Sequence, residues 1–379
     1  MLTILTSLLK SIDEVLNYLI HHIFTEQTLV DTIVLFIFLI SLSVAFIFLY
    51  LFRKKKRWRR KVFLQKSLNN FIGEIAICES ETELTEVFSN AEYQGVLLQF
   101  QQKESDRNLL ISELSETTKK FRGSTMENIL WLFEKMNLKK QLLKNLENKK
   151  WHKKAKVIQQ LAYLQRKDCI KFIVPFTNHE NDLLRMEAQI ALVKMIGFKG
   201  LEFLSKVTYP VSEWQQLRLI EELSSNACTS LDNIHVWLKS ENISVVNFAL
   251  RLIEIYQQFD FYEEVTSCLT HSSKTVCNNA VLTISNISNE KTADLLVAHF
   301  KDYDAFIQIK ILQILQANGS GNQLPFLFSI LNHPDDSYKL EAAKAILKIS
   351  DTGILTIEEL IDRNSFPWNV ILPQIKNVA

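Results

Sequence analysis

The chain has 379 residues, of which 47% are hydrophobic, while only 8 are glycine and 6 are proline. This length allows a large core or about two to three domains. The scarcity of turn-forming residues argues against a fold rich in β-turns or in glycine loops that hold phosphate, and the abundance of helix-forming residues predicts an all-α protein. The net charge of +1 hides a strong polarity, because residues 1–52 sum to −3, residues 53–61 to +8 and the remaining residues to −4.

Residues 1–28 are predicted to form an amphipathic helix. Leucine, isoleucine and valine recur there at steps of three and four residues, whereas Lys10, Asp13 and Glu14 lie on the other side. Such a helix could lie flat on the outer leaflet of a membrane or pack against the membrane helices of a partner. Spanning the bilayer is disfavoured, because both carboxylates would then lie near its centre.

Residues 29–52 are predicted to form a transmembrane helix. The stretch Thr32–Phe52 contains 21 residues without a charge. A helix of that length is about 30 Å long, which matches the hydrocarbon core of a bilayer. A cleaved signal peptide is excluded, since the apolar stretch is too long and its basic flank lies on the wrong side.

The juxtamembrane segment 53–61 carries eight bases and no acid. The positive-inside rule places this flank in the cytoplasm, which predicts a single-pass protein of the inner (cytoplasmic) membrane with its N-terminus outside. The segment could also bind anionic lipid, at roughly 1 kcal/mol per base. The candidate lipid or partner contacts are Arg53, Lys54, Lys55, Lys56, Arg57, Arg59, Arg60 and Lys61.

Residues 62–149 show helical spacing without clear repetition, and we interpret them as a helical cap or linker that shields the first repeat. The remaining residues, 363–379, form a short C-terminal segment after the repeats.

Internal repetition predicts that residues 150–362 form an α-solenoid of about seven stacked helical hairpins. Equivalent positions, which we call the anchor positions, follow one another at steps of 31, 31, 30, 31, 31 and 31 residues. They are Lys154, Arg185, Gln216, Val246, Cys277, Gln308 and Lys339. Aliphatic residues lie seven places after every anchor, and small or aliphatic residues lie three places after it. A second apolar set is expected eighteen places after each anchor, with Glu264 as its one misfit.

These repeats resemble the HEAT family, particularly its short variety of roughly thirty residues in bacterial proteins. The resemblance rests on Asp182–Ala188 with Ile196-Gly197, and on Asp335-Asp336 with Glu341–Ile346. It implies a superhelical scaffold that offers one face to a protein partner. Several repeats lack the arginine, which puts in doubt any function tied to that side chain.

Sequence motifs for catalysis, cofactors or metals are missing, including GxGxxG, GxxxxGK, HExxH and GxSxG. The Asp351-Thr-Gly353 triplet is interpreted as an ordinary turn between helices. Five cysteines at irregular spacing, without a CxxC pair, argue against disulfides and zinc and are expected to be buried thiols. We therefore predict no catalytic, cofactor-binding or metal-binding residue, no cofactor, and no enzyme activity.

A lysine-rich stretch at the start of the array is a second candidate surface. Lys149, Lys150, Lys153 and Lys154 are interleaved with aromatic residues there and could be a solvated face, or could contact anionic lipid or an acidic partner. Nucleic acid is disfavoured because the array is not basic. Trp214 and Trp237, within the array, are expected to be core residues.

The predicted function is that of a membrane-anchored protein–protein interaction scaffold. It could be an accessory to a membrane enzyme, such as a glycosyltransferase that makes a surface polysaccharide. Two alternatives remain: a short-HEAT-repeat enzyme, lyase-like or acting on nucleic acid as the resemblance allows, and a peripheral regulator that binds anionic lipid. No small-molecule substrate is identified.

Overall fold

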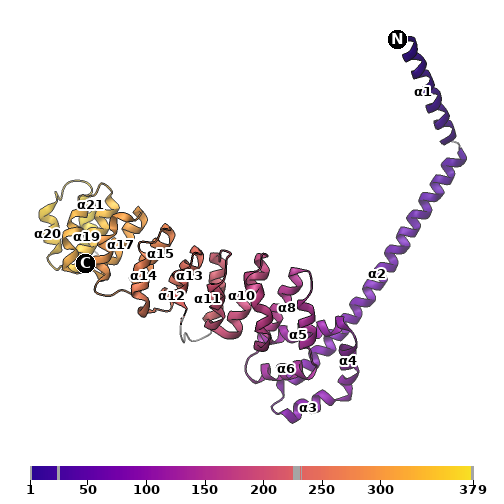
Figure 1. Ribbon diagram of the computed structural model, residues 1–379, viewed down its shortest axis with the longest axis horizontal. Coiled ribbons are helices and arrows are strands. Elements are labelled where there is room, and N and C mark those ends of the chain that lie inside the picture. Colours follow the sequence, from indigo (N-terminus) through magenta and orange to yellow (C-terminus); the bar gives the residue numbers. More distant parts are fainter. Residues whose placement is uncertain (1, 24–25, 225–230, 232, 377–379) are drawn as a thin grey trace. The chain divides into compact units, whose positions relative to one another are not determined.

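The computed structural model describes residues 2–23, 26–224, 231 and 233–376, and every regular element among them is helical (Figure 1). The chain divides into two units, Met1–Gln141 and Leu142–Ala379. The division falls within helix α7 (Lys139–Leu146), a few residues before the predicted start of the array.

The first unit contains six helices before the division. Two of them, α1 (Leu2–Ile23) and α2 (Glu26–Ile77), have 22 and 52 residues. The shorter helices α3 (Glu81–Ser89), α4 (Ala91–Gln102), α5 (Glu104–Lys120) and α6 (Ser124–Lys135) follow and pack against the end of α2.

Helix α2 continues without interruption from the apolar stretch, through the basic segment, into the core of the first unit. Its side chains are exposed from Val30 to Phe63, and burial begins at Leu64. The buried positions follow helical spacing, so one face of the helix enters the core. They are Leu64, Leu68, Phe71, Ile72 and Ile75. The predicted anchor and cap thus share one helix.

The second unit is an all-α solenoid. Its seven long helices follow one another in chain order along the array (Figure 1). They are α8 (Trp151–Tyr163), α10 (Asp182–Ile196), α11 (Glu213–Leu223), α13 (Ile243–Ile255), α15 (Lys274–Asn286), α17 (Ala305–Asn318) and α19 (Asp336–Ile349). Their first residues are separated by 31, 31, 30, 31, 31 and 31 residues, which is the spacing of the anchor positions.

Short return segments, partly 3₁₀-helical, connect the long helices. The first return segment consists of η1 (Lys167–Cys169), α9 (Ile170–Ile173) and η2 (Val174–Asn178). The second is η3 (Gly197–Ser205), the third contains α12 (Ile234–Trp237), and the fourth consists of η4 (Phe259–Phe261) and α14 (Tyr262–Cys268). The others are α16 with η5 (Thr292–Ala298 and Phe300–Asp302), η6 with α18 (Gly321–Gln323 and Leu324–Ile330), and α20 (Gly353–Leu360). Helix α21 (Trp368–Lys376) closes the described array.

The positions three and seven places after each anchor are all buried, as the repeat pattern predicts. Leu161, Leu192, Leu223, Ile253, Ile284, Leu315 and Ile346 are each at most 4% exposed. One apolar cluster extends from Ile190 to Ile375, so stacked repeats share a continuous core.

The second apolar set is placed one residue too early in most repeats. Phe172 is 39% exposed, whereas its neighbour Ile173 is fully buried. Val265 is likewise fully buried beside the misfit Glu264. The return segments are partly 3₁₀-helical, with about three residues per turn instead of 3.6, so the inward-facing position shifts. Ile234 and Ile357 do fill the expected place, since both are fully buried.

Candidate functional site

The exposed apolar part of α2 is the first candidate surface. Of the described helices, α2 alone is long and apolar enough to cross a membrane, and none of its most apolar window is buried within the protein. Side chains such as Phe46, Phe48 and Phe52 are 69–71% exposed. An apolar surface of this size is unfavourable in water and matches a lipid or protein environment.

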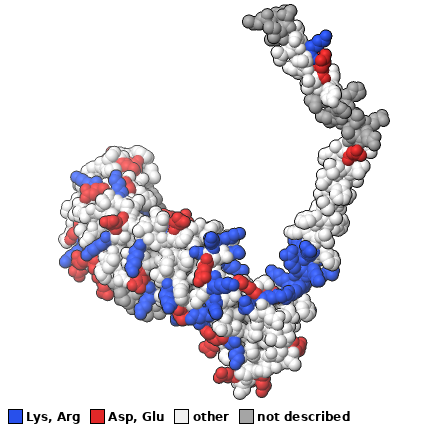
Figure 2. Space-filling view, turned by 45° about the vertical axis from the view of Figure 1, so that its right-hand side comes forward, with Lys and Arg blue, Asp and Glu red and all other residues white. Residues whose placement is uncertain are grey.

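The basic segment continues α2 directly beyond its uncharged part, and Figure 2 shows its lysine and arginine side chains gathered around the helix. All eight predicted contact residues of this segment are exposed. Trp58, which lies between Arg57 and Arg59 in the sequence, is 63% exposed. A tryptophan next to charged residues is typical of the membrane–water boundary.

Arg60 has a contact that the sequence pattern does not predict. Its guanidinium lies 2.6 Å from the carboxylate of Asp106 in α5, whose side chain is only 11% exposed. Gln65, one turn further along α2, donates to Glu113 of α5 at 2.7 Å. These bonds join the end of the basic segment to the body of the first unit.

The second group of lysines lies at the start of the second unit. Lys149, Lys150 and Lys153 are exposed, and Trp151 beside them is 40% exposed. Lys154 differs, because it is half-buried with its ammonium 5.0 Å from the centre of the Phe176 ring. Three of these four predicted contacts are therefore open to a ligand, and the fourth supports the fold.

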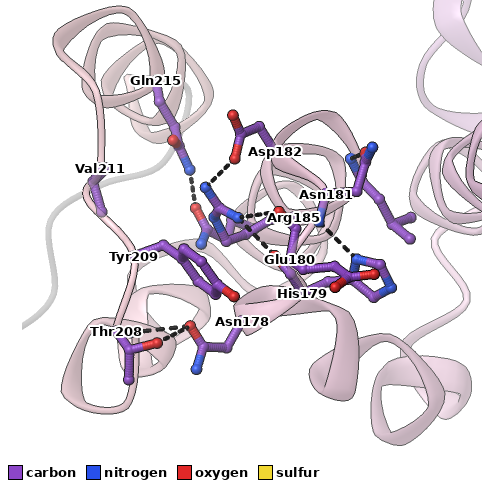
Figure 3. Close-up of polar contacts among 12 residues, drawn as sticks. Asn178, His179, Glu180, Asn181, Asp182, Arg185, Thr208, Tyr209, Val211 and Gln215 are labelled. Atoms are coloured by element: carbon purple, nitrogen blue, oxygen red, sulfur yellow. Dashed lines mark hydrogen bonds and ion pairs between the residues drawn. The ribbon is translucent and has the colours of Figure 1, made fainter.

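The anchor position of α10 organises the turn before its helix (Figure 3). Arg185 donates from Nη1 to the His179 carbonyl at 2.6 Å, and its Nη2 lies 2.6 Å from Asp182. The guanidinium also lies 4.3 Å from the centre of the Tyr209 ring. Since Arg185 is only 5% exposed, these contacts replace the water that its charge would otherwise need.

Other repeats keep this contact with different side chains. Gln216 donates to the Val211 carbonyl at 3.1 Å, Cys277 to the His271 carbonyl at 3.0 Å, and Gln308 to the Phe300 carbonyl at 3.0 Å. Val246 cannot donate, and there Asn242 donates to the carbonyls of Val207 and Tyr209. Three of the replaced arginines therefore leave the contact in place, whereas the Val246 repeat is held through Asn242 to the segment before α11.

Six places before the anchor, a side chain accepts the backbone N–H of the residue that caps the long helix. His179, His271 and His333 do so through Nδ1 at 3.0–3.1 Å. Asn148 and Ser240 do the same at 3.0 and 3.2 Å. Three of the histidines are thus turn-forming residues, a role that the sequence reasoning missed and that their constant offset could have shown.

A groove with a volume of about 1510 Å³ lies at the N-terminal ends of α11, α13, α15 and α17. The turns before α11 and α13 form part of its wall. Its lining includes the polar side chains Ser244, Asn247, Arg251, Thr275, Asn278 and Asn279. Phe306 also lines it and is 66% exposed.

The two tryptophans of the array differ in burial. Trp237 is 2% exposed and donates to Ser205 at 3.0 Å, so it is a core residue as predicted. Trp214 is 57% exposed, so the prediction that it is a core residue is wrong. It lies two residues after Ser212, the cap of α11.

The cysteine side chains suit a packing role. Cys78, Cys169 and Cys268 are buried and Cys277 is half-buried, and none of these four forms a disulfide, while Cys228 lies outside the described residues. Burial raises the pKa of Cys268 to about 11, so its thiol stays protonated at neutral pH. Within the described ranges, no three His, Cys, Asp or Glu side chains cluster as a metal site would need.

Neither a protein-family model nor a curated protein matches this chain. Similar solved structures include an engineered protein, with 14% identity, coverage of 82% of this chain and 95% of that chain, and a TM-score of 0.36. Importin beta has 11% identity, coverage of 80% and 45%, and a TM-score of 0.35, so this chain spans under half its length. The CpcE and CpcF complex of phycocyanin lyase from a Nostoc species has 14% identity, coverage of 75% and 94%, and a TM-score of 0.24. The assignment of a solenoid fold therefore rests on the spacing of the long helices in this chain. No activity of these similar proteins is assigned to it.

Proposed function

We propose that this protein is a single-pass membrane protein whose helical array is a scaffold for a protein partner. The observation that carries the proposal is the continuity of α2. One helix bears an exposed uncharged stretch, then eight bases, and then the buried face of the first unit. Because no flexible linker separates these parts, the first unit would be held directly at the membrane surface.

The charge pattern supports an orientation with the N-terminus outside and both folded units in the cytoplasm. The eight bases follow the uncharged stretch, and bases next to a membrane helix stay on the cytoplasmic side. On this account α1 lies on the outer face, with its carboxylates Asp13 and Glu14 in contact with water.

The array supports binding rather than catalysis. Donors and acceptors before the long helices hold the turns of the array, and the groove at the N-terminal ends of four of these helices is open and lined by polar, apolar and oppositely charged side chains. Tethering a groove to the membrane raises the effective concentration of any membrane-bound partner without new contacts. The partner class we favour is a membrane enzyme of the cell envelope, such as a glycosyltransferase for surface polysaccharide, in a bacterial inner membrane, with the array as a short HEAT-type scaffold.

A second candidate function is binding of anionic lipid by the second unit. The exposed Trp151 beside Lys149, Lys150 and Lys153 favours it, since an aromatic side chain among bases suits the headgroup region.

Cysteine accessibility tests the orientation. The five native cysteines are replaced by alanine, and single cysteines are introduced as Ser11→Cys in α1 or Ser272→Cys in the array. A membrane-impermeant maleimide should label the first in intact cells or spheroplasts and the second only after permeabilisation. Equal labelling of Ser272→Cys before and after permeabilisation would contradict the proposed orientation.

A further inference from the structure

The lining of the groove includes side-chain amides that are held in place by hydrogen bonds to neighbouring helices. Asn279 donates to Asn247 at 3.0 Å, which links α15 to α13. Asn278 donates to Asp304 at 3.2 Å, which links α15 to the cap of α17. Each bond uses one amide group, so the Nδ2 hydrogens of Asn247 and the Oδ1 atoms of Asn278 and Asn279 keep bonding capacity in the groove.

One position of the repeat sets the shape of this surface. It is the second residue after the cap of each long helix, occupied by Trp214, Ser244, Thr275 and Phe306 in α11, α13, α15 and α17. The two middle residues are small hydroxyl residues, whereas Trp214 and Phe306 are 57% and 66% exposed. The groove is therefore lined by small polar side chains at Ser244 and Thr275 and by the exposed ring of Phe306, while Trp214 lies beside the groove, next to its lining residue Glu213.

The charges around the groove balance. Lys206, Lys239 and Arg251 line it together with Glu213, Glu241 and Glu254. A strongly basic or acidic ligand would gain attraction from one set and repulsion from the other. An uncharged ligand rich in amide groups is the better complement.

The open donors and acceptors also distinguish between backbone conformations. An α-helix has already used its central N–H and C=O groups and would present none to the asparagines. An extended peptide presents one donor and one acceptor per residue. Packed helices lie about 8–10 Å apart, so three repeats span roughly 24–30 Å, which an extended chain covers with about seven to nine residues at 3.3 Å each.

We propose that the groove binds an extended, uncharged peptide segment of a partner protein, with its backbone on the asparagine amides and two apolar side chains, about seven to nine residues apart, one on Phe306 in the groove and the other on Trp214 just outside it. The inference rests on the proposed scaffold function and names the chemistry of the segment that the array would bind.

The test selects ligands from a displayed library of random dodecapeptides on the detergent-solubilised full-length protein. Selected peptides are then measured by fluorescence anisotropy. We expect an uncharged consensus with apolar residues at the stated separation. Trp214→Ala, Phe306→Ala and the double variant Asn247→Ala/Asn278→Ala should each weaken binding by about tenfold or more, which is the effect of losing an interface anchor.

Two matched controls keep the test independent of folding. Phe259→Ala removes an aromatic side chain that is 57% exposed outside the groove, and Asn369→Ala removes an exposed asparagine in α21. Both variants should bind the selected peptides with an affinity within about twofold of the parent, because a substitution on the surface outside the binding site has little effect. Thermal unfolding of every variant excludes loss of the fold.

Three outcomes would overturn the inference. They are a charged consensus, a consensus with helical spacing of three and four residues, and peptides that bind the groove variants as well as the parent. A partner that still co-purifies with the folded groove variants would leave the scaffold intact and place docking elsewhere. Failure of the protein to remain in membranes would instead remove the proposed function while leaving the peptide result unaffected.

Discussion

Gln308 occupies the place in α17 that Arg185 occupies in α10, and both donate a hydrogen bond to a backbone carbonyl of the segment before their helix, at 3.0 and 2.6 Å. The position therefore selects for a donor that reaches back to the turn, and its charge is secondary. Gln216 and Cys277 make the same kind of contact, whereas Val246 has no side-chain donor and Lys339 pairs with Asp336 instead.

Arg185→Ala should destabilise the second unit by about 2–3 kcal/mol, because it leaves buried carbonyls without a donor. Arg185→Gln should recover part of the loss, as glutamine makes the same contact in α17. Arg218→Ala is the control, since it removes only an exposed ion pair with Glu221 and should cost under about 1 kcal/mol. Thermal or urea unfolding measures all three, and equal losses for Arg185→Ala and Arg218→Ala would contradict the assigned role.

Gly200→Ala should destabilise the array by roughly 1–3 kcal/mol, the usual cost of overpacking. A Cβ at Gly200 would lie 2.6 Å from backbone atoms of Leu192 and Val193, so η3 would have to move away from α10. Gly95→Ala in α4 is the matched control. It meets nothing within 4 Å and should be neutral or stabilising, because alanine favours a helix. A neutral Gly200→Ala in thermal unfolding would show that the close approach is absent.

Stability of the end of the array should fall as the solution becomes acidic. A hydrogen bond from Lys376, followed by the charge of Arg363, lowers the pKa of Glu358. A carboxyl group with a lowered folded-state pKa contributes stability above its unfolded pKa, and this contribution is lost as pH falls through the folded value. Glu358→Gln should lower the melting temperature at neutral pH and flatten its dependence on acid pH. If the melting temperature of Glu358→Gln falls at acid pH as much as that of the parent, other groups cause the acid dependence and the role of Glu358 is contradicted.

Neutralising the exposed lysines at the start of the array should separate the lipid function from the scaffold function. In a chain that begins at residue 62, Lys149→Gln/Lys150→Gln/Lys153→Gln should reduce flotation with vesicles of anionic lipid if this patch binds them. The control changes Lys199, Lys274 and Lys301, which are also exposed. Binding that resists both substitutions, or that persists in high salt, would remove the lipid candidate.

The sequence predicts the parts of the fold that depend on α-helical periodicity. The long helices follow one another at the spacing of the anchor positions, and the residues seven places after each anchor are all buried. Prediction fails at the return segments, where Ile173 replaces Phe172 in the core because a 3₁₀ turn advances the chain differently.

The candidate site was only partly predictable. The exposed basic residues of α2 follow from charge and position alone, whereas the partner of Arg60 depends on how α5 packs and has no sequence signal. Tryptophan is usually buried, which predicts a core position for Trp214, yet this side chain is exposed beside the groove. A groove arises from the placement of turns on neighbouring repeats, which no periodic pattern specifies.

Co-purification in mild detergent tests the scaffold most directly. The full-length protein is compared with a chain that begins at residue 62, which keeps the buried face of α2 from Leu64 onward and loses the membrane-spanning stretch. The account predicts one membrane protein in stoichiometric amount with the full-length protein and its loss or strong depletion with the shortened chain. Recovery of the folded full-length protein without any stoichiometric partner, from cells that express it at its natural level, would contradict the scaffold.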